Sequence, residues 1–386
     1  MARHSIILLI LAALSLIALG ITMLASTTFE IAQEGSEDYV TLWRQLAWLG
    51  VAVVACVFAA MIDYNAWMRW RWHILTTTAV LLALCYVPMI GVKINGSKRW
   101  IGLQALGMGG FRVQPSEFAK IALIIALAGW YATHEALTRT FVRGFLLPGL
   151  ILTAIVALIG CEFDLGSALL ASTVGLGVMF VAGTKMRYLA LIVVMCAGGL
   201  WAGIKYLPNR MERVMVVFDL EKHKEGLGLQ QWVSKLAFGS GGIEGRGLGE
   251  GRMKLSYLPE AHTDFIFPMV GEELGLRGTA AVVLAFAVLV MAGMVVSAYA
   301  PNRFGKLLGA GVTFLLGMEA LLNMGVTTAL LPNKGLPLPF VSYGGSSLVA
   351  AMVAVGILIN IHRQGVHLTW DQLPVIRRKR RWTPQL

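Results

Sequence analysis

One acid in the sequence stands between a proline-containing turn and an apolar segment. The stretch LPEAHTDFIF, residues 258–267, places Asp264 directly before Phe265, Ile266 and Phe267. A carboxylate beside an apolar surface is short of water and holds a proton more tightly, which makes it a better general base. Aspartate is also a favoured N-cap residue. By local rules Asp264, or Thr263 before it, could instead begin the following helix.

Two other stretches place positive charge beside an aromatic ring or among glycines. INGSKRWIGL (94–103) puts Arg99 next to Trp100, which suits a membrane interface where phosphates and sugars lie, or a simple interfacial anchor. FGSGGIEGRGLGEGR (238–252) carries Arg246 among glycines, whose backbone N–H groups could approach a phosphate. Each stretch is a candidate contact for an anionic ligand, and the glycine signal alone is weak.

The last loop and the opening stretch add three more candidates. LLPNKGLPLPFVSYGGSS (330–347) contains Lys334, which could hold a phosphate as a point charge, and Ser342. The same prolines and glycines are also typical of a tight, packed turn. In the opening stretch, His262 could orient Asp264 or only pack beside it, and Glu260 could pair with a cation of the loop.

A further set of charges falls at the beginnings of apolar segments. In QPSEFAK (114–120), Glu117 and Lys120 are three residues apart and therefore share one face of a helix. Asp164 begins another apolar segment, in CEFDLGSA (161–168). Charge inside a membrane is costly unless it is paired. We therefore expect a Lys120–Asp164 pair, which could be structural or could help to form a substrate cavity.

The composition indicates the kind of element that positions these residues. The chain has 386 residues, of which 57% are hydrophobic and only 14% charged, and its mean hydropathy is +0.71. Apolar runs of this length are typical of transmembrane helices. We predict an all-α polytopic integral membrane protein with ten transmembrane helices, near residues 5–25, 46–62, 72–92, 116–133, 143–161, 165–183, 187–206, 277–298, 305–325 and 340–361. The short segment 265–276 would be an interfacial or re-entrant piece leading into the eighth helix.

Positive charge predicts how these helices are oriented. The tail, residues 362–386, contains RRKRR, so both termini should be cytoplasmic. A large extracytoplasmic loop (207–264) then joins helices 7 and 8, and it is basic, as is loop 93–115. Basic charge on the outer side indicates either pairing with the loops' own acids or an anionic ligand. We expect one membrane domain, residues 1–386, with its helices at about 5–361 and a basic cytoplasmic tail that contacts anionic lipid.

Several classes of function lack support in the sequence. No GxxxxGK[ST] motif occurs, which argues against hydrolysis of a nucleoside triphosphate. The net charge of +11 is explained by cytoplasmic loops and lipid contacts, so no nucleic-acid partner is expected. No metal-ligand cluster is evident, although a divalent cation such as Mg²⁺ or Mn²⁺ could help to neutralise a bound diphosphate.

Seven of these stretches together resemble one protein family. GSKRW, QPSEFAK, DLGSA, GSGGIEGRGLG, YLPEAHTDFIF, GEELG and LPNKGLPLPFVSYGGSS are similar, in this order, to the motifs of the SEDS family (shape, elongation, division and sporulation proteins). The resemblance extends from about residue 90 to 350 and is highly specific. LPEAHTDFIF followed by GEELG, with NKG in the last loop, is closer to the cell-division branch (FtsW) than to the elongation branch (RodA).

The resemblance implies a function that the residues alone leave open. It implies ten transmembrane helices in the bacterial cytoplasmic membrane, at the division septum, and a peptidoglycan glycosyltransferase that polymerises lipid II at the outer face. A class B penicillin-binding protein and other division proteins would be its partners. The family's essential acid falls on Asp264, its outer-loop tryptophan on Trp100, and its cavity pair on Lys120 and Asp164.

Three positions depart from the family pattern, and one rival function remains. Val233 stands where a second glutamine follows Gln230, Ala329 stands in place of a glycine, and Phe163 in place of a proline. These changes affect loop shape and leave the expected base in place. The rival is a lipid II flippase, which needs matching polar groups through the membrane. A scaffold that only recruits division proteins would explain neither the acid nor the basic outer loops.

Overall fold

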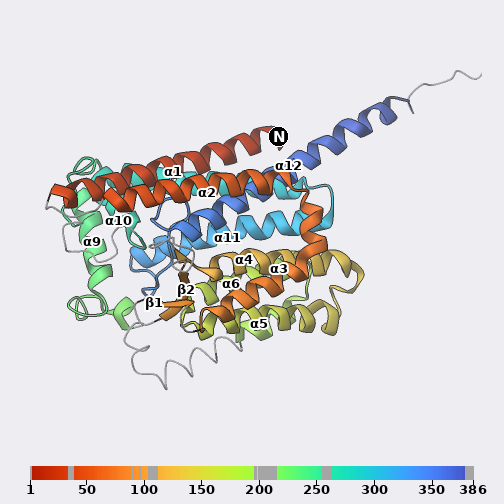
Figure 1. Cartoon of the computed structure of the whole chain (residues 1–386), viewed down its shortest axis with the longest axis horizontal. Coiled ribbons are helices and arrows are strands. Elements are labelled where there is room, and N and C mark those ends of the chain that lie inside the picture. The colour runs from red at the N-terminus through yellow and green to blue at the C-terminus, as the bar shows by residue number, and fades with distance from the viewer. Residues whose placement is uncertain are drawn as a thin grey trace, which may run out of the picture.

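The computed structural model describes residues 2–33, 39–87, 90–94, 97–102, 112–194, 198, 215–253 and 263–378. Within these ranges, long helices lie side by side and a small sheet sits at one end of the bundle (Figure 1). The helices are α1 (Ala2–Gln33), α2 (Tyr39–Met61), α3 (Tyr64–Leu84), α4 (Pro115–Thr133), α5 (Leu147–Cys161), α6 (Leu165–Val181), α9 (Leu229–Gly241), α10 (Ile266–Ala298), α11 (Arg303–Thr327) and α12 (Gly345–Arg378). A 3₁₀ turn (Glu135–Leu137) and a π-helical turn (Val142–Leu146) connect α4 to α5.

Six helices in the described part of the chain are long and apolar enough to cross a membrane. They cover His4–Ser26, Val40–Met61, Val142–Cys161, Ile266–Ala298, Arg303–Thr327 and Gly345–Gly365. The prediction of a helical, multi-pass membrane protein is therefore confirmed.

The other four predicted spans fall on less apolar or shorter segments. α4 and α6 are helical where spans were predicted near 116–133 and 165–183, but α6 has only 17 residues and α4 carries two charges near its start. The span predicted near 72–92 is wrong at its end, because α3 ends at Leu84 and residues 91–92 form part of a strand. Most of 187–206 lies outside the described residues. The count of ten spans stays a prediction.

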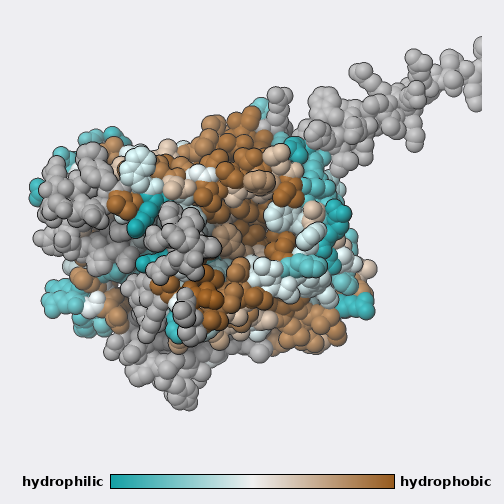
Figure 2. All heavy atoms as spheres, in the orientation of Figure 1, coloured by the Kyte–Doolittle hydropathy of each residue, from teal (hydrophilic) through white to brown (hydrophobic). Residues whose placement is uncertain are grey.

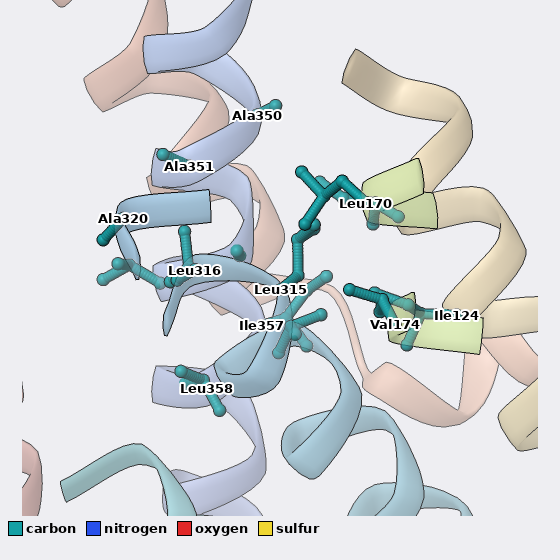
Figure 3. Packing of buried hydrophobic residues seen from close by; sticks show 14 of the residues in the cluster. Ile124, Leu170, Val174, Leu315, Leu316, Ala320, Ala350, Ala351, Ile357 and Leu358 are labelled. Carbon is teal, nitrogen blue, oxygen red and sulfur yellow. The ribbon is translucent and has the colours of Figure 1, made fainter. Parts of the chain in front are cut away.

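The core lies where α4, α6, α11 and α12 meet. Ile124 of α4 and Val174 of α6 face Leu315 of α11 and Ile357 of α12, and each is at most 3% exposed (Figure 3). α2 packs along α12, and α1 packs along α10. These contacts pack segments from both halves of the sequence into one bundle.

The surface of the bundle is apolar where lipid tails would lie. In the view of Figure 2, hydrophobic residues cover the middle of the molecule and hydrophilic ones gather toward its right-hand end. Val54 and Phe58 of α2 and Leu284 of α10 are each more than half exposed. Large exposed apolar residues on the outside of a helical bundle are expected of a surface that faces lipid.

A small antiparallel sheet, which the sequence analysis did not predict, precedes α4. Its strands are β1 (Gly91–Ile94), β2 (Ser97–Gly102) and β3 (Arg112–Val113), paired in the order β1-β2-β3. Trp100 lies opposite Val92 in the register. The sheet fixes Arg99 and Trp100 at the end of the bundle where α4 begins.

Three backbone positions with positive φ shape this same end of the bundle. Gly275 (φ +65°, ψ −162°) breaks α10 after its first turns, so the segment predicted to lead into the eighth helix is a short helix joined to it by a kink. Phe163 has φ +62°, a value that proline cannot adopt, and Ala329 has φ +60°, which favours glycine. The backbone at Phe163 therefore differs from any that a proline there would allow.

Candidate functional site

Asp264 lies in a turn immediately before α10 and is half-buried. The N-cap residue of α10 is Phe265, whose side chain makes no capping hydrogen bond. The interpretation of Thr263 or Asp264 as the N-cap is therefore wrong. Phe265, Ile266 and Phe267 are buried, so they anchor the acid at the edge of the core.

The position of Asp264 is set by two residues from α11 and the last loop. The Nδ2 group of Asn323 donates hydrogen bonds to the carbonyl oxygens of Asp264 (2.8 Å) and Leu336 (2.6 Å). A Cβ atom on Gly335 would lie only 2.7 Å from Oδ2 of Asp264. The sequence analysis missed Asn323, although an amide within an apolar span was a usable signal.

Lys334 precedes the glycine that contacts the acid. Its side chain is half-buried, and this burial lowers the pKa of its ammonium group. The backbone turns tightly here, because the N–H of Leu336 donates to the carbonyl of Lys334 (2.9 Å). A lysine that lacks part of its hydration is ready to bind an anion.

Hydrogen bonds made by Ser342, Gln230 and Gln231 hold the last loop in place. The buried Ser342 accepts a hydrogen bond at Oγ from the N–H of Leu338 (2.8 Å). Gln231 of α9 donates from Nε2 to the carbonyls of Val326 (2.8 Å) and Leu331 (2.7 Å). In addition, the Nδ2 group of Asn333 donates to Oε1 of Gln230 (2.6 Å). The loop is thus fastened within itself and to α9.

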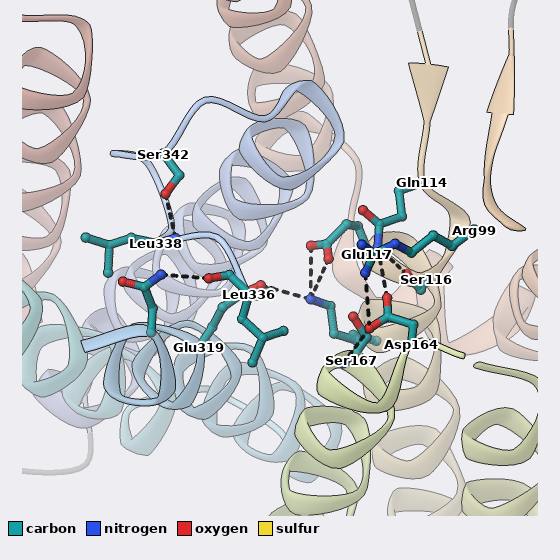
Figure 4. Close-up of polar contacts among 12 residues, drawn as sticks. Arg99, Gln114, Ser116, Glu117, Asp164, Ser167, Glu319, Leu336, Leu338 and Ser342 are labelled. Carbon is teal, nitrogen blue, oxygen red and sulfur yellow. Dashed lines mark hydrogen bonds and ion pairs between the residues drawn. The ribbon is translucent and has the colours of Figure 1, made fainter. Parts of the chain in front are cut away.

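A group of charges lies buried between α4 and α11. Nζ of Lys120 is 2.9 Å from both carboxylate oxygens of Glu117 and 2.9 Å from Oε1 of Glu319 (Figure 4). None of the three residues is more than 3% exposed. The predicted Lys120–Asp164 pair is therefore wrong in this structure, because Glu319, which the sequence analysis missed, takes the place of Asp164.

Asp164 has other partners at the start of α6. Its Oδ1 accepts a hydrogen bond from the N–H of Ser167 (3.1 Å) and caps the helix, and its Oδ2 accepts one from Nε2 of Gln114 (3.1 Å). The guanidinium of Arg99 approaches to 3.8 Å (Figure 4). One carboxylate thus connects the sheet, α4 and α6.

The charges around Asp164 and the loop beside Asp264 are neighbours. Leu336 follows Gly335 in the loop, and its Cγ would lie 3.2 Å from a Cβ atom on Gly166. Gly166 is two residues beyond Asp164. The predicted residues Arg99, Asp164, Asp264 and Lys334 are therefore gathered at one end of the bundle, the end that carries α9 and the sheet (Figure 1).

Trp100 and Arg246 lie on the outer parts of this end. Trp100 is half-buried in β2. Nε of Arg246 is 4.0 Å from Oε1 of the buried Glu272, and it donates to the carbonyl of Ser240 (3.4 Å). His262 and Glu260 lie outside the described residues.

The arrangement contains what a transfer reaction of an anionic, lipid-linked group needs. It offers the carboxylate of Asp264, whose backbone is held by Asn323, and the cations Arg99, Arg246 and Lys334 at the same end of the bundle. Among the described residues, no three His, Cys, Asp or Glu side chains lie together in a way that could hold a metal ion.

The chain matches known proteins over nearly its whole length. The family model described as "Cell cycle protein" (FTSW_RODA_SPOVE) matches residues 6–367. A probable peptidoglycan glycosyltransferase FtsW of Geobacter sulfurreducens is 40% identical over 363 residues, which cover 93% of this chain and 95% of that protein. Stage V sporulation protein E of Bacillus subtilis is 34% identical over 359 residues, covering 92% of this chain and 96% of that protein.

Solved structures have the same fold. The rod shape determining protein RodA of Thermus thermophilus superposes with a TM-score of 0.66 at 26% identity, covering 92% of this chain and 96% of that one. A chain from a structure of a peptidoglycan synthase complex that coordinates polymerization and crosslinking gives a TM-score of 0.75 at 26% identity, with 92% and 97% covered. The resemblance first seen in the short motifs is confirmed, and the chain belongs to the FtsW, RodA and SpoVE family of cell cycle proteins.

Proposed function

We propose that this chain is a peptidoglycan glycosyltransferase that polymerises lipid II into glycan strands at the outer face of the bacterial cytoplasmic membrane during cell division. Its relatives over most of the chain carry the name peptidoglycan glycosyltransferase FtsW. The observation that carries the proposal is the placement of Asp264, which Asn323 holds through the backbone and which contacts Gly335 next to Lys334.

The reaction joins the hydroxyl of one sugar to the anomeric carbon of another. Asp264 takes the proton from the attacking hydroxyl as its oxygen bonds to the anomeric carbon. The bond from that carbon to the lipid diphosphate breaks, and its electron pair leaves with the diphosphate oxygen. Direct displacement of an α-linked diphosphate inverts the carbon and gives a β-linked polymer.

Positive charge must stabilise the departing diphosphate. Arg99, Arg246 and Lys334 lie at the same end of the bundle as Asp264, and we propose them for this role. Trp100, in the strand that carries Arg99, would pack against the sugar and peptide part of the substrate. Ser342 would act by shaping the loop that carries Lys334.

Lys120 is not among the proposed diphosphate contacts. Its ammonium is 1% exposed and is bound by two glutamates, so it would have to leave both partners to reach a substrate. The group of Glu117, Lys120 and Glu319 acts as a brace between α4 and α11. A divalent cation such as Mg²⁺ or Mn²⁺ could enter with the diphosphate, and no step above depends on one.

The family supports a proposal for the partners and the location. A related chain comes from a structure in which polymerization and crosslinking are coordinated in one complex. We propose that a class B penicillin-binding protein crosslinks the strands made here, and that both proteins work with other division proteins at the septum. Ten spans with cytoplasmic termini would place Asp264 outside, where lipid II presents its headgroup.

The rival function is a lipid II flippase. A flippase needs polar groups along a path through the membrane. Glu117, Lys120 and Glu319 are the polar cluster nearest to that description, but they are closed off by one another. A self-paired cluster favours a structural brace over a path for a headgroup.

The experiment that separates the two is made on the purified wild-type protein with its cognate crosslinking partner. We expect it to convert lipid II into polymer in detergent or vesicles. No polymer, together with movement of lipid II across the vesicle bilayer, would establish the flippase in its place.

A further inference from the structure

We propose that Glu272 and Glu273 of the GEELG motif are positioning residues, which bind the glycine-rich loop 241–253 through its backbone and so set the place of Arg246. The inference rests on the proposed function for the role it gives Arg246. The hydrogen bonds between these two glutamates and the loop, which we call the clamp, are a property of the fold and do not depend on the function.

Glu272 binds the far end of the loop. This residue is 0% exposed. Its Oε1 accepts a hydrogen bond from the N–H of Arg252 (2.9 Å), and its Oε2 accepts one from the N–H of Met253 (3.1 Å). The guanidinium of Arg246 lies 4.0 Å from the same carboxylate. A buried carboxylate is stable only with such partners, and here the loop supplies the N–H groups and the nearest cation.

Glu273 binds the middle of the loop and a second helix. This residue is 1% exposed. Its Oε2 accepts a hydrogen bond from the N–H of Gly249 (3.1 Å), and both oxygens accept from the hydroxyl of Ser26 on α1 (2.8 and 2.7 Å). One side chain therefore joins the loop to α10 and to α1.

Backbone bonds complete the clamp at the near end. The N–H of Arg246 donates to the carbonyl of Glu272, and the N–H of Gly247 donates to that of Glu273, both at 3.0 Å. The N–H of Leu276 donates in the other direction, to the carbonyl of Gly242 (2.9 Å). Arg246 is thus held by its own backbone N–H at a point where the loop is bonded to the helix on both sides.

Glycines on both sides allow this close approach. A Cβ atom on Gly251 would lie 2.9 Å from Oε1 of Glu273, and one on Gly245 would lie 2.2 Å from the carbonyl oxygen of Glu273. A Cβ atom on Gly275 would lie 2.4 Å from the N atom of Gly245. Gly245, Gly251 and Gly275 therefore serve one packed contact, and the loop does not need to bind a phosphate to account for these three glycines.

The clamp links the position of Arg246 to that of Asp264, because both residues are positioned by the same short helix. Asp264 lies two residues before the helical segment that begins at Ile266, and Glu272 lies before the kink at Gly275. The seven helical residues from Ile266 to Glu272 span about 10 Å. That rigid segment would set the separation between Asp264 and the loop that carries Arg246.

The test compares Glu272→Gln and Glu273→Gln with a control, Glu244→Gln. Glu244 lies in the same loop but is exposed and forms an ion pair with the exposed Arg277. Hydrogen exchange of a peptide covering 245–253 reports the clamp, and the KM for lipid II with the partner present reports its effect. We expect exchange at Gly249, Arg252 and Met253 to rise by about tenfold in the two variants, with a rise of similar size in KM, a smaller change in kcat and no change in the control.

The two readouts distinguish every outcome. Unchanged exchange in both variants would overturn the clamp. Faster exchange with an unchanged KM would overturn the positioning role. Glu273→Asp, which keeps the charge, should recover part of the protection if the variant Glu273→Gln fails to fold well. A wild-type protein that polymerises nothing would contradict the proposed function while leaving the exchange result to decide the clamp.

Discussion

At the scale of single residues, the account depends on how closely the last loop approaches Asp264. Gly335 leaves no room for a side chain beside Oδ2 of the acid, and Asn323 holds the backbone on both sides of this contact. The backbone of Asp264 is therefore held, and its carboxylate has room beside the loop only because residue 335 has no side chain. A displacement of about 1 Å in such a geometry can cost about 100-fold in rate.

Gly335→Ala tests this contact. The added methyl group must push the carboxylate of Asp264 aside, and we expect kcat for lipid II polymerisation to fall by about 10- to 100-fold. Gly344→Ala in the same loop is the control, because a Cβ atom there meets only Ser347 at 3.7 Å, an ordinary contact. Equal activity in the two variants would mean that the approach of Gly335 to the acid has no catalytic role.

Glu162 is a second residue with a distinctive environment. It is 0% exposed, and its carboxylate lies beside the Cys85 thiol and near the charges of Asp164 and Arg99. Burial raises the pKa of this carboxyl to about 8, and the nearby charge of Asp164 adds to the shift, although the Cys85 thiol and Arg99 oppose it. At neutral pH the folded protein therefore holds a proton here that the unfolded chain releases.

This shift gives a pH dependence of stability with a defined sign. The folded pKa is raised, so the stabilisation is complete below the ordinary value of 4.5 and is lost as the pH rises toward about 8. We expect the wild-type protein to lose stability, on the order of a few kcal/mol, between pH 5 and pH 8. Thermal unfolding of Glu162→Gln should lack that part of the slope; an identical pH profile would show that Glu162 does not carry it.

At the scale of elements, buried charge joins α4 to α11. Lys120 on α4 binds Glu117 on its own helix and Glu319 on α11. Removing one partner of a buried pair leaves the other charge uncompensated, which typically costs about 3–5 kcal/mol. The cost should depend strongly on which member is removed.

Two substitutions in this cluster should differ in their effect. Lys120→Met leaves two glutamates facing each other with no cation, and we expect a loss of about 3–5 kcal/mol or a failure to fold. Glu319→Gln leaves the Lys120–Glu117 pair balanced and keeps a hydrogen-bond acceptor, so we expect a loss of only about 1 kcal/mol. Unfolding of the two purified variants measures the difference. If Glu319→Gln were the more harmful, the charge balance described here would be wrong.

At the scale of the whole molecule, the sequence predicted the multi-pass membrane class, which the structure confirms, while the outer location of the site stays a prediction. Apolar runs were sufficient for the membrane class, because lipid acts on long segments. The sheet formed by residues 91–113 was not predicted. Its strands are short, and the charged residues and glycines among them give no clear strand pattern. The segment 265–276 was predicted as a short piece before the eighth helix, and the kink at Gly275 gives that prediction its physical cause.

The contacts between distant segments could not be predicted in the same way. The partner of Lys120 proved to be Glu319 instead of Asp164, because both acids lie beside apolar segments and the sequence alone does not rank their distances. Asn323 and Gln231 bind backbone carbonyls of segments distant in sequence. These segments lie beside them only in the folded chain, so the sequence does not reveal the contacts. Ser342, predicted to bind substrate, uses its hydroxyl oxygen to hold the loop.

The most direct test of the central claim is the rate of lipid II polymerisation by Asp264→Asn, measured with the cognate crosslinking partner present. Asparagine has the shape of aspartate but cannot accept the proton, and a general base contributes about 100- to 10,000-fold. Asp219→Asn, which removes an exposed acid paired with Lys222 on the surface, is the control for folding and insertion. We expect Asp264→Asn to be folded and to lose polymerisation by at least about 100-fold while the control keeps the wild-type rate. A wild-type rate in Asp264→Asn would contradict the account.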